Sequence, residues 1–371
     1  MIWSFIMPVS TQPRYHKRIN AVSREGVSTY SLSFKRDYVP GPNGFKAEML
    51  GEIEAGSYLR RLVPILRAVP KVRRKARQSE VLYAFGLDML LLSWLSLIGM
   101  KHRPSLVYEV ADIRDVFIEN SLVGLVARSI EDFLLKKSEL LVVTSEAYLS
   151  EYFRKNYRLD STSTIVIENK VDEVRMDARP SESSYTKNHH DTCITIGYYG
   201  LIRCYRSCEV LAVSASMSDN IKVEVRGVGH GGVHGLSEFA DSNSDIAYGG
   251  SYVNPDDLPE MYGSVDIVWA CYPYGQRDTG NWRWARTNRF YESLFFGRPL
   301  IAQRGTEDAK SVERYEIGLV VDLGDRKFAS QQISRISRED IKRWTQNLNR
   351  VPRSVYIYTD EHRRLVQAAK A

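Results

Sequence analysis

Short apolar segments of strand character alternate with amphipathic segments of helical character along most of the chain. This alternation restricts the possible folds more than any other feature. Val81–Phe85 is an uninterrupted apolar run, Asp88–Leu97 repeats apolar residues at helical spacing, and Ser105–Val110 is again apolar. Such a succession favours a mostly parallel sheet with helices on its faces. Further strands are predicted at 2–9, 27–34, 140–144, 161–167, 193–199, 221–225, 266–270 and 299–302, and further helices at 13–25, 147–156, 207–215, 258–262 and 289–296.

The alternation is interrupted once, by the polar segment 172–190, and then begins again. With 371 residues, the chain is longer than a single hydrophobic core usually organises. The sequence therefore predicts two doubly wound, Rossmann-like α/β domains that face each other across a cleft. We expect an N-terminal domain over 1–171, a linker over 172–190, a second domain over 191–345 and a helical tail over 346–371 that could pack back on the first domain.

The composition is that of a folded protein, because 43% hydrophobic and 26% charged residues exclude a collagen-like or largely disordered chain. A net charge of +6 is too small to indicate nucleic-acid binding by itself. The four cysteines are too few for a disulfide-built domain, and they indicate reduced thiols in the cytoplasm. Cys204 and Cys208 form a C-x3-C pair without a second Cys/His pair at zinc-finger spacing, so we expect no metal site.

Two arginines follow the strand that begins the second domain. Gly200 lets the backbone approach a ligand closely, and Arg203 and Arg206 precede a helix for which Ser207 is the expected N-cap. Helix N-terminal amides together with a guanidinium can hold a phosphate. The alternative is an ordinary strand-to-helix loop whose arginines face solvent.

The segment 279–302 carries the most information. Thr287 or Asn288 is expected to cap a helix that Gly297 ends. Arg289 and Glu292 lie three residues apart on one face of that helix, where an ion pair would contribute about 0.2–0.5 kcal/mol. The functional alternative is that a cation for a diphosphate and a carboxylate for vicinal hydroxyls project together from one helix.

These segments together resemble the donor-binding half of a GT-B glycosyltransferase, most closely the family-4-like enzymes that use nucleotide sugars to build bacterial surface polysaccharides. The first half is similar more loosely, and only the motif 288–302 is specific. In the second half the resemblance is carried by Gly197–Gly200 with Arg203, Val225–Gly227, Asp257–Tyr262, Val265–Ile267, Asn288–Glu292 and Gly297–Ala302. In the first half it is carried by Val107–Asp112, Val142–Ser145 and Glu168–Val171.

The resemblance implies a donor site in which Glu292 binds the ribose hydroxyls and Arg203 and Arg289 hold the diphosphate of a UDP- or GDP-linked sugar, with no further cofactor. Trp284 stands where the family often has a second glutamate, and Trp282 and Trp284 could stack on a sugar or pack between domains. The donor site implied in full is Gly200, Arg203, Arg206, Gly227, Arg286, Thr287, Asn288, Arg289 and Glu292.

The resemblance also implies a transfer that retains the anomeric configuration and needs no metal, because the two arginines Arg203 and Arg289 can neutralise the leaving group. In such enzymes the departing diphosphate can help to deprotonate the acceptor. Asp112 follows a predicted strand and is the candidate for orienting the donor sugar or the acceptor; the alternative is a loop cap. Catalytic roles therefore fall to Asp112, Arg203 and Arg289.

The tract Arg60–Arg77 holds eight positive charges and no acidic residue. Pro64 and Pro70 are expected to break any long helix there. Basic and interleaved apolar residues would hold this tract on an anionic membrane, which predicts a peripheral protein on the inner face of the cell membrane with a saccharide or lipid-linked acceptor. A solvated helix face is the alternative, and nucleic acid is not expected because interleaved aromatic residues are missing.

Two other functions remain open from the sequence. One is a nucleotide-sugar epimerase of the same fold, and the other is a non-catalytic adaptor that binds membrane or nucleic acid. The run Gly227–Gly232 formally matches G-x-G-x-x-G, but it follows the second strand of its domain rather than the first, which makes a dinucleotide site improbable. We interpret it as a glycine loop near the donor.

Overall fold

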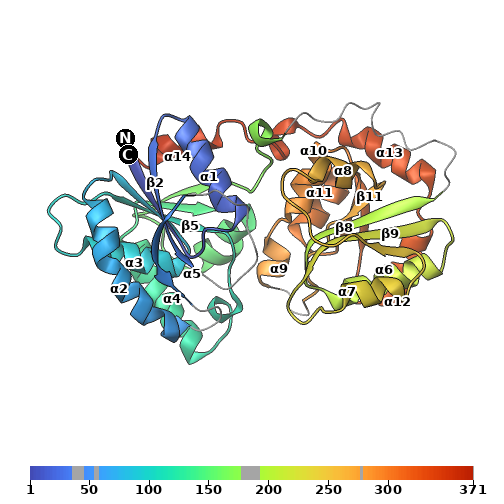
Figure 1. Ribbon diagram of the computed structural model, residues 1–371, viewed down its shortest axis with the longest axis horizontal. Helices are drawn as coiled ribbons and strands as arrows, with labels where there is room; N and C mark the ends of the chain where they lie inside the picture. The colour runs from blue at the N-terminus through green and yellow to red at the C-terminus, as the bar shows by residue number, and fades with distance from the viewer. Residues whose placement is uncertain (36–45, 54–57, 177–192, 276–278, 371) are drawn as a thin grey trace. The chain divides into compact units, whose positions relative to one another are not determined.

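Figure 1 shows the computed structural model of the protein, which describes residues 1–35, 46–53, 58–176, 193–275 and 279–370. The chain divides into two compact units. Unit 1 comprises Met1–Glu168 with Thr359–Ala371, and unit 2 comprises Asn169–Tyr358. Most of the predicted linker, from residue 177 onward, lies outside the described residues, as does the side chain of Arg60.

Unit 1 is built on a seven-stranded sheet in the order β3-β2-β1-β4-β5-β6-β7, and every pair of neighbours is parallel. The central strands are apolar and buried along their whole length, as a sheet covered on both faces requires. The strands are β1 (Ile2–Met7), β2 (Ser28–Lys35), β3 (Glu48–Glu52), β4 (Val81–Phe85), β5 (Ser105–Val110), β6 (Leu140–Val143) and β7 (Ser163–Val166).

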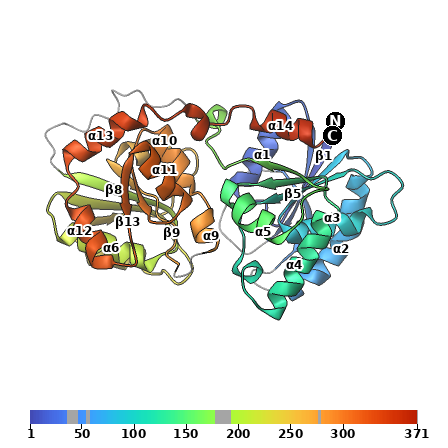
Figure 2. The ribbon, with the colours of Figure 1, turned by 180° about the vertical axis from the view of Figure 1, so that it is seen from behind.

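The helices of unit 1 lie on both faces of this sheet (Figure 2). Right-handed crossovers place α1 (Pro13–Arg24) on one face, together with α14 (Glu361–Ala368), which packs against it. On the other face, α3 (Leu87–Leu97) packs against both α2 (Tyr58–Ala76) and α4 (Leu122–Leu135). The helix expected at 147–156 is present as a π-helical segment, Tyr148–Phe153, followed by α5 (Arg154–Asn156).

The expectation that Pro64 and Pro70 break the basic tract is wrong, because α2 runs without interruption through both prolines. Ile65, Ala68 and Val72 recur at helical spacing on its buried face. Their burial against neighbouring elements favours a continuous helix, and it offsets the hydrogen bonds that the two prolines cannot donate.

Unit 2 has a six-stranded parallel sheet in the order β10-β9-β8-β11-β12-β13. Its strands are β8 (Ile194–Ile202), β9 (Ile221–Gly229), β10 (Ile246–Tyr248), β11 (Ile267–Trp269), β12 (Leu300–Gln303) and β13 (Gly318–Val321). Its helices are α6 (Tyr205–Ser216), α7 (Leu236–Asp241), α8 (Leu258–Gly263), α9 (Asn281–Trp284), α10 (Asn288–Phe295), α11 (Glu307–Tyr315), α12 (Arg326–Ser334) and α13 (Arg338–Leu348). The predicted parallel α/β architecture is thus present in both units.

A buried polar network joins the last helix of the chain to unit 1. The guanidinium of Arg18 donates from Nε to Glu109 at 2.9 Å, and its Nη1 lies 2.9 Å from Nε2 of His362 in α14. Tyr83 donates its hydroxyl to the same carboxylate. All four side chains are buried, so the hydrogen bonds among them replace those that water would otherwise make. The segment 346–358, in contrast, belongs to unit 2.

Acid should weaken this network. Burial lowers the pKa of His362 to about 2, and the positive charge of Arg18 acts in the same direction. The neutral imidazole is therefore favoured in the folded state, so its contribution to stability is complete above about pH 6.5 and falls by about 1.4 kcal/mol for each pH unit below that. We expect the free energy of unfolding to drop more steeply between about pH 7 and pH 5 in the wild type than in His362→Gln, as measured by denaturant titration. Equal slopes would contradict this assignment.

Candidate active site

The topology of unit 2 marks one place for a ligand. From β8 the chain continues to β9 and β10 on one side, and from β11 it continues to β12 and β13 on the other. β8 and β11 are neighbours, so their carboxyl ends form the switch point at which ligands of doubly wound sheets bind.

Arg289 bridges this switch point. It is the second residue of α10, and it donates one hydrogen bond to the carbonyl of Tyr199 in β8 and another to the carbonyl of Cys271 just after β11, both at 3.0 Å. Its guanidinium also lies over the ring of Tyr198, 5.3 Å from the centroid. The half-buried side chain therefore places a positive charge at the carboxyl ends of two adjacent strands.

Glu292 follows on the same helix and is held by other partners. Its carboxylate accepts a hydrogen bond of 2.7 Å from the hydroxyl of Tyr262 and one of 3.3 Å from the amide of Asn254. Burial and the negative charge of Glu292 both raise the pKa of Tyr262, so this phenol stays protonated and remains a donor. Arg289 and Glu292 thus bond different groups and not each other. The carboxylate of Glu292 is oriented by residues of the segment between β10 and β11.

The start of α10 is fixed by a buried carboxylate. Thr287 is the N-cap, and its hydroxyl accepts from the amide of Phe290 at 3.1 Å. The hydroxyl and the amide of Thr287 both donate to Oδ2 of Asp308 in α11, at 2.7 and 3.1 Å. Of the two residues considered for the cap, Thr287 is the N-cap. Its hydroxyl and amide hold the start of the helix in place.

Two glycines are required where β8 and β9 meet. Gly200 and Gly227 face each other in the ladder, with φ of 100° and 143°. A Cβ at Gly227 would approach the carbonyl oxygen of Gly200 to 1.9 Å, and a Cβ at Gly200 would lie 3.7 Å from the hydroxyl of Tyr252. The close approach to Gly200 explains Gly227, and the positive φ explains Gly200, in both cases without reference to a ligand. The glycine run extends β9 as far as Gly229 before it turns.

The remaining basic residues differ in how firmly they are held. Arg203 is exposed just after β8. Arg206 donates to the carbonyl of Leu323 at 2.8 Å and stacks over Tyr274, 4.4 Å from the ring centroid. Ser207 is not the N-cap: α6 begins at Tyr205, so Ser207 already lies inside the first turn.

Arg286, Asn288 and the two tryptophans are held by local contacts. Arg286 donates to Ser311 at 2.9 Å, and Asn288 accepts from Asn169 at 2.6 Å. Trp284 is buried in unit 2, whereas Trp282 is half-buried with the guanidinium of Arg283 4.5 Å from its ring centroid.

Known proteins share this architecture. The chain matches HepE from Anabaena, solved in complex with UDP, with a TM-score of 0.71 and 14% identity over 99% of both chains. It matches sucrose-phosphate synthase from Thermosynechococcus elongatus with a TM-score of 0.71 and 12% identity, covering 99% of this chain and 98% of that one. This chain has the GT-B glycosyltransferase fold. The two-domain fold expected from the sequence is thereby confirmed.

A relative with higher sequence identity is a succinoglycan biosynthesis protein, ExoL from Rhizobium meliloti (strain 1021). It is 28% identical over 323 residues, which cover 84% of this chain and 79% of the relative. No protein-family model matches the chain.

In the N-terminal half of the GT-B fold, Asp112 follows β5 and accepts a hydrogen bond of 3.0 Å from Arg14 of α1. The carboxylate is about half exposed, so it lies at the surface of the carboxyl edge of this sheet. The hydrogen bond between Arg14 and Asp112 connects the segments that follow β1 and β5, which gives Asp112 a structural role. The carboxylate remains accessible to solvent.

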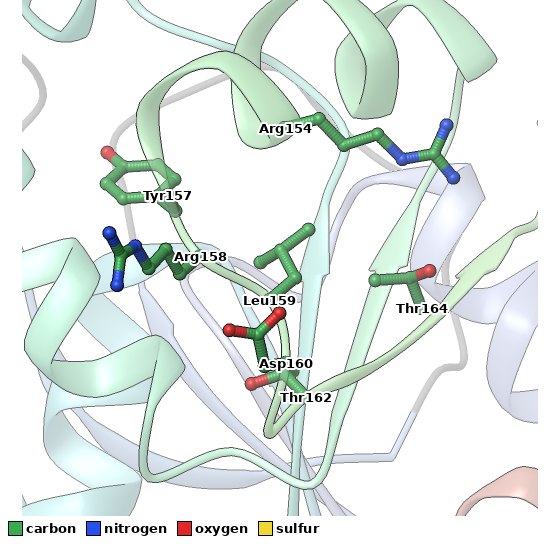
Figure 3. Close-up of a pocket in the computed structure, with 7 residues that line it drawn as sticks. All are labelled: Arg154, Tyr157, Arg158, Leu159, Asp160, Thr162 and Thr164. Atoms are coloured by element: carbon green, nitrogen blue, oxygen red, sulfur yellow. The ribbon is translucent and has the colours of Figure 1, made fainter.

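A cavity of about 420 Å³ lies elsewhere in unit 1 (Figure 3). Its walls come from the segment 154–160 and from Thr162 and Thr164 around the beginning of β7. Because it surrounds the amino end of an edge strand, it lies at the edge of the sheet opposite to the one where doubly wound folds bind ligands. We therefore place no reaction in it.

Among the described residues, no group of three or more His, Cys, Asp and Glu side chains is arranged to hold a metal ion. Within the same residues, no helix combines the length and the apolar character needed to cross a membrane.

The carboxylate behind α10 should make stability depend on pH. Burial raises the pKa of Asp308 to about 6, and its Oδ1 has no hydrogen-bond partner among the residues that the structure describes. The protonated form is therefore favoured in the folded state. Its contribution is complete below about pH 3.8 and is lost as the pH rises to about 6, which amounts to about 3 kcal/mol.

We expect the stability of the wild type relative to Asp308→Asn to decline between about pH 4 and pH 6.5 in denaturant titrations. Asp325→Asn removes the exposed carboxylate that caps α12 and is the matched control. If the difference in free energy of unfolding between wild type and Asp308→Asn stayed constant with pH, the folded state would not disfavour the ionised form of Asp308.

Proposed function

We propose that this chain is a glycosyltransferase that moves a sugar from a nucleotide-sugar donor to a saccharide or lipid-linked acceptor in the synthesis of a bacterial surface polysaccharide. The similarity to a succinoglycan biosynthesis protein supports the pathway class, and the UDP complex of HepE supports a uridine nucleotide as the first donor to test. Unit 2 would bind the donor and unit 1 the acceptor.

The observation that carries the proposal is the pair formed by Arg289 and Glu292 on α10. The guanidinium sits at the switch point of the sheet, and the carboxylate is held one turn further along the helix by Tyr262. A carboxylate with fixed orientation can accept from both hydroxyls of a ribose, and a guanidinium can face a diphosphate. A nucleoside diphosphate presents these two groups next to each other.

The other donor-site residues take roles that follow from their exposure. Arg203 is exposed and free to reach the diphosphate, while Arg206 and Arg289 are oriented by backbone carbonyls. Arg286, Thr287 and Asn288 would act by holding the N-terminus of α10 in place, since their side chains bond to protein groups. The backbone at Gly200 and Gly227 would form the floor of the site.

The chemistry would need few groups from unit 1. Arg203 and Arg289 neutralise the negative charge that develops on the leaving diphosphate, so we propose transfer without a metal ion. In a retaining reaction that diphosphate takes the proton of the acceptor hydroxyl as the new glycosidic bond forms. Asp112 would orient the sugar or the acceptor.

We also propose that the protein works in the cytoplasm, peripherally on the inner face of the cell membrane, through the tract Arg60–Arg77. Several cations of α2 have protein partners: Arg61 pairs with Asp88 at 2.5 Å, and Arg74 pairs with Glu48 at 2.5 Å. Arg67 and Arg77 are exposed and would face an anionic headgroup layer.

The first experiment is a calorimetric titration of the protein with UDP, GDP and CMP. Glu292→Gln should weaken binding of the preferred nucleotide about ten- to hundredfold, because a charge-assisted hydrogen bond to the ribose contributes about 1.5–3 kcal/mol. Glu313→Gln removes an exposed carboxylate on α11 and is the control. Unchanged affinity in Glu292→Gln would remove the main support for this site.

A second titration separates the two ends of the nucleotide. Arg203→Gln should weaken UDP binding by about tenfold but leave uridine binding unchanged, because the lost charge faces only the diphosphate. Glu292→Gln should weaken both ligands. If Arg203→Gln weakened uridine and UDP equally, its assignment to the diphosphate would be wrong.

A further inference from the structure

The first turns of α4 expose an unusual number of large apolar side chains. Leu122, Val123, Leu125 and Val126 are 81%, 67%, 54% and 59% exposed, and Ile130 and Phe133 continue the exposed face further along the helix. Single exposed apolar residues are common on soluble proteins, but a contiguous apolar face marks a surface that something else covers.

The same edge of unit 1 exposes apolar residues of a second helix. Leu62, Val63 and Leu66 of α2 are 42%, 53% and 58% exposed. α2 follows β3 and α4 follows β5, and each leads back to the next parallel strand, so both helices begin at the carboxyl edge of the sheet. α3 lies between them in contact with both, as Figures 1 and 2 also show.

α2 changes from apolar to basic along its length, whereas the exposed face of α4 stays apolar as far as Phe133. The exposed cations of α2 are Arg67, Lys71, Arg74 and, directly after the helix, Arg77, and Arg74 also pairs with Glu48. The exposed lysines Lys136 and Lys137 follow the end of α4, where Lys136 pairs with Asp132. At 1.5 Å per residue, Leu66 and Lys71 are about 7.5 Å apart along the helix axis, which is comparable with the depth of about 5–10 Å to which interfacial helices enter a bilayer.

We propose that the first turns of α2 and α4 insert together into an anionic lipid bilayer, with the basic second half of α2 facing the phosphate headgroups. We refer to Leu62, Val63, Leu66, Leu122, Val123, Leu125 and Val126 as the insertion surface. Apolar burial supplies the depth and the cations supply the preference for anionic lipid. The row of cations that borders this apolar surface on α2 favours a continuous layer of anionic headgroups over a protein partner.

The insertion surface goes beyond attachment by the basic tract, because it fixes an orientation. It turns the carboxyl edge of the unit 1 sheet toward the bilayer. If the proposed transfer is correct, this orientation would present the acceptor side to a lipid-linked saccharide; the binding itself does not depend on the transfer.

The test is flotation of the full chain with vesicles of phosphatidylcholine alone and of an equal mixture of phosphatidylcholine and phosphatidylglycerol, at low and high salt. The wild type should bind the mixed vesicles. The triple variant Leu122→Ser/Val123→Ser/Val126→Ser should bind them more than about tenfold more weakly at either salt concentration, because it loses apolar burial. High salt should weaken the wild type as well.

The control is Val213→Ser/Met217→Ser/Phe328→Ser, which removes three apolar side chains of unit 2 that are 47%, 49% and 50% exposed and should bind like the wild type. Thermal unfolding and UDP titration of the α4 variant should match the wild type, so a failure of the donor site is seen separately. The inference is overturned if the wild type does not bind at low salt, or if the α4 variant binds as well as the wild type. It is equally overturned if light scattering without lipid shows that the wild type and the unit 2 control are dimers whereas the α4 variant is a monomer, since the surface would then join two copies.

Discussion

The bridge that Arg289 makes between the carbonyls of Tyr199 and Cys271 is the constraint on which the candidate site depends. β11 pairs with β8 only as far as Gly197, so on this side of β8 the carbonyl of Tyr199 lies beyond the ladder, as does that of Cys271 after β11. The guanidinium satisfies both carbonyls. α10 is thereby tied to the sheet at its switch point. The direction of the helix then determines where Glu292 lies, and Tyr262 and Asn254 determine how its carboxylate is turned.

A second tie holds the same helix from behind. Asp308 is buried in α11 and accepts two hydrogen bonds from Thr287, so the first turn of α10 is fixed by a carboxyl group that gains little from solvent. The positive charge of Arg286 and the hydrogen bonds from Thr287 offset part of the cost of burying this group when it is ionised. A site that must hold a flexible ligand benefits from a helix whose N-terminus cannot shift.

The sequence predicted the parallel sheets and most of their strands because uninterrupted apolar runs such as Val81–Phe85 are buried on both faces. It failed for β3, β10 and β13, which are short or contain glycine and polar residues, and it gave no sign of α4, whose apolar residues face outward. The two prolines of α2 led to a wrong prediction, because the rule that proline breaks helices describes a local energetic cost. Tertiary packing of the helix overrides that cost here.

The site was predicted as a set of residues but not as an arrangement. Motif spacing predicted that Arg289 and Glu292 share one helix face. Nothing in the spacing reveals that Arg289 bonds carbonyls of β8 and of the segment after β11, or that Glu292 bonds a tyrosine from α8. Tyr262, Asn254 and Asp308 were not singled out, because a hydrogen bond across 21 to 38 positions leaves no local pattern.

The return of the chain to unit 1 also has a consequence for how the protein is made. α14 belongs to unit 1 but is synthesised after all of unit 2. While the ribosome is still producing unit 2, any pairing of Arg18 with Glu109 has to form without His362 and without α14. Unit 1 therefore reaches its final packing only after α14 has left the exit tunnel.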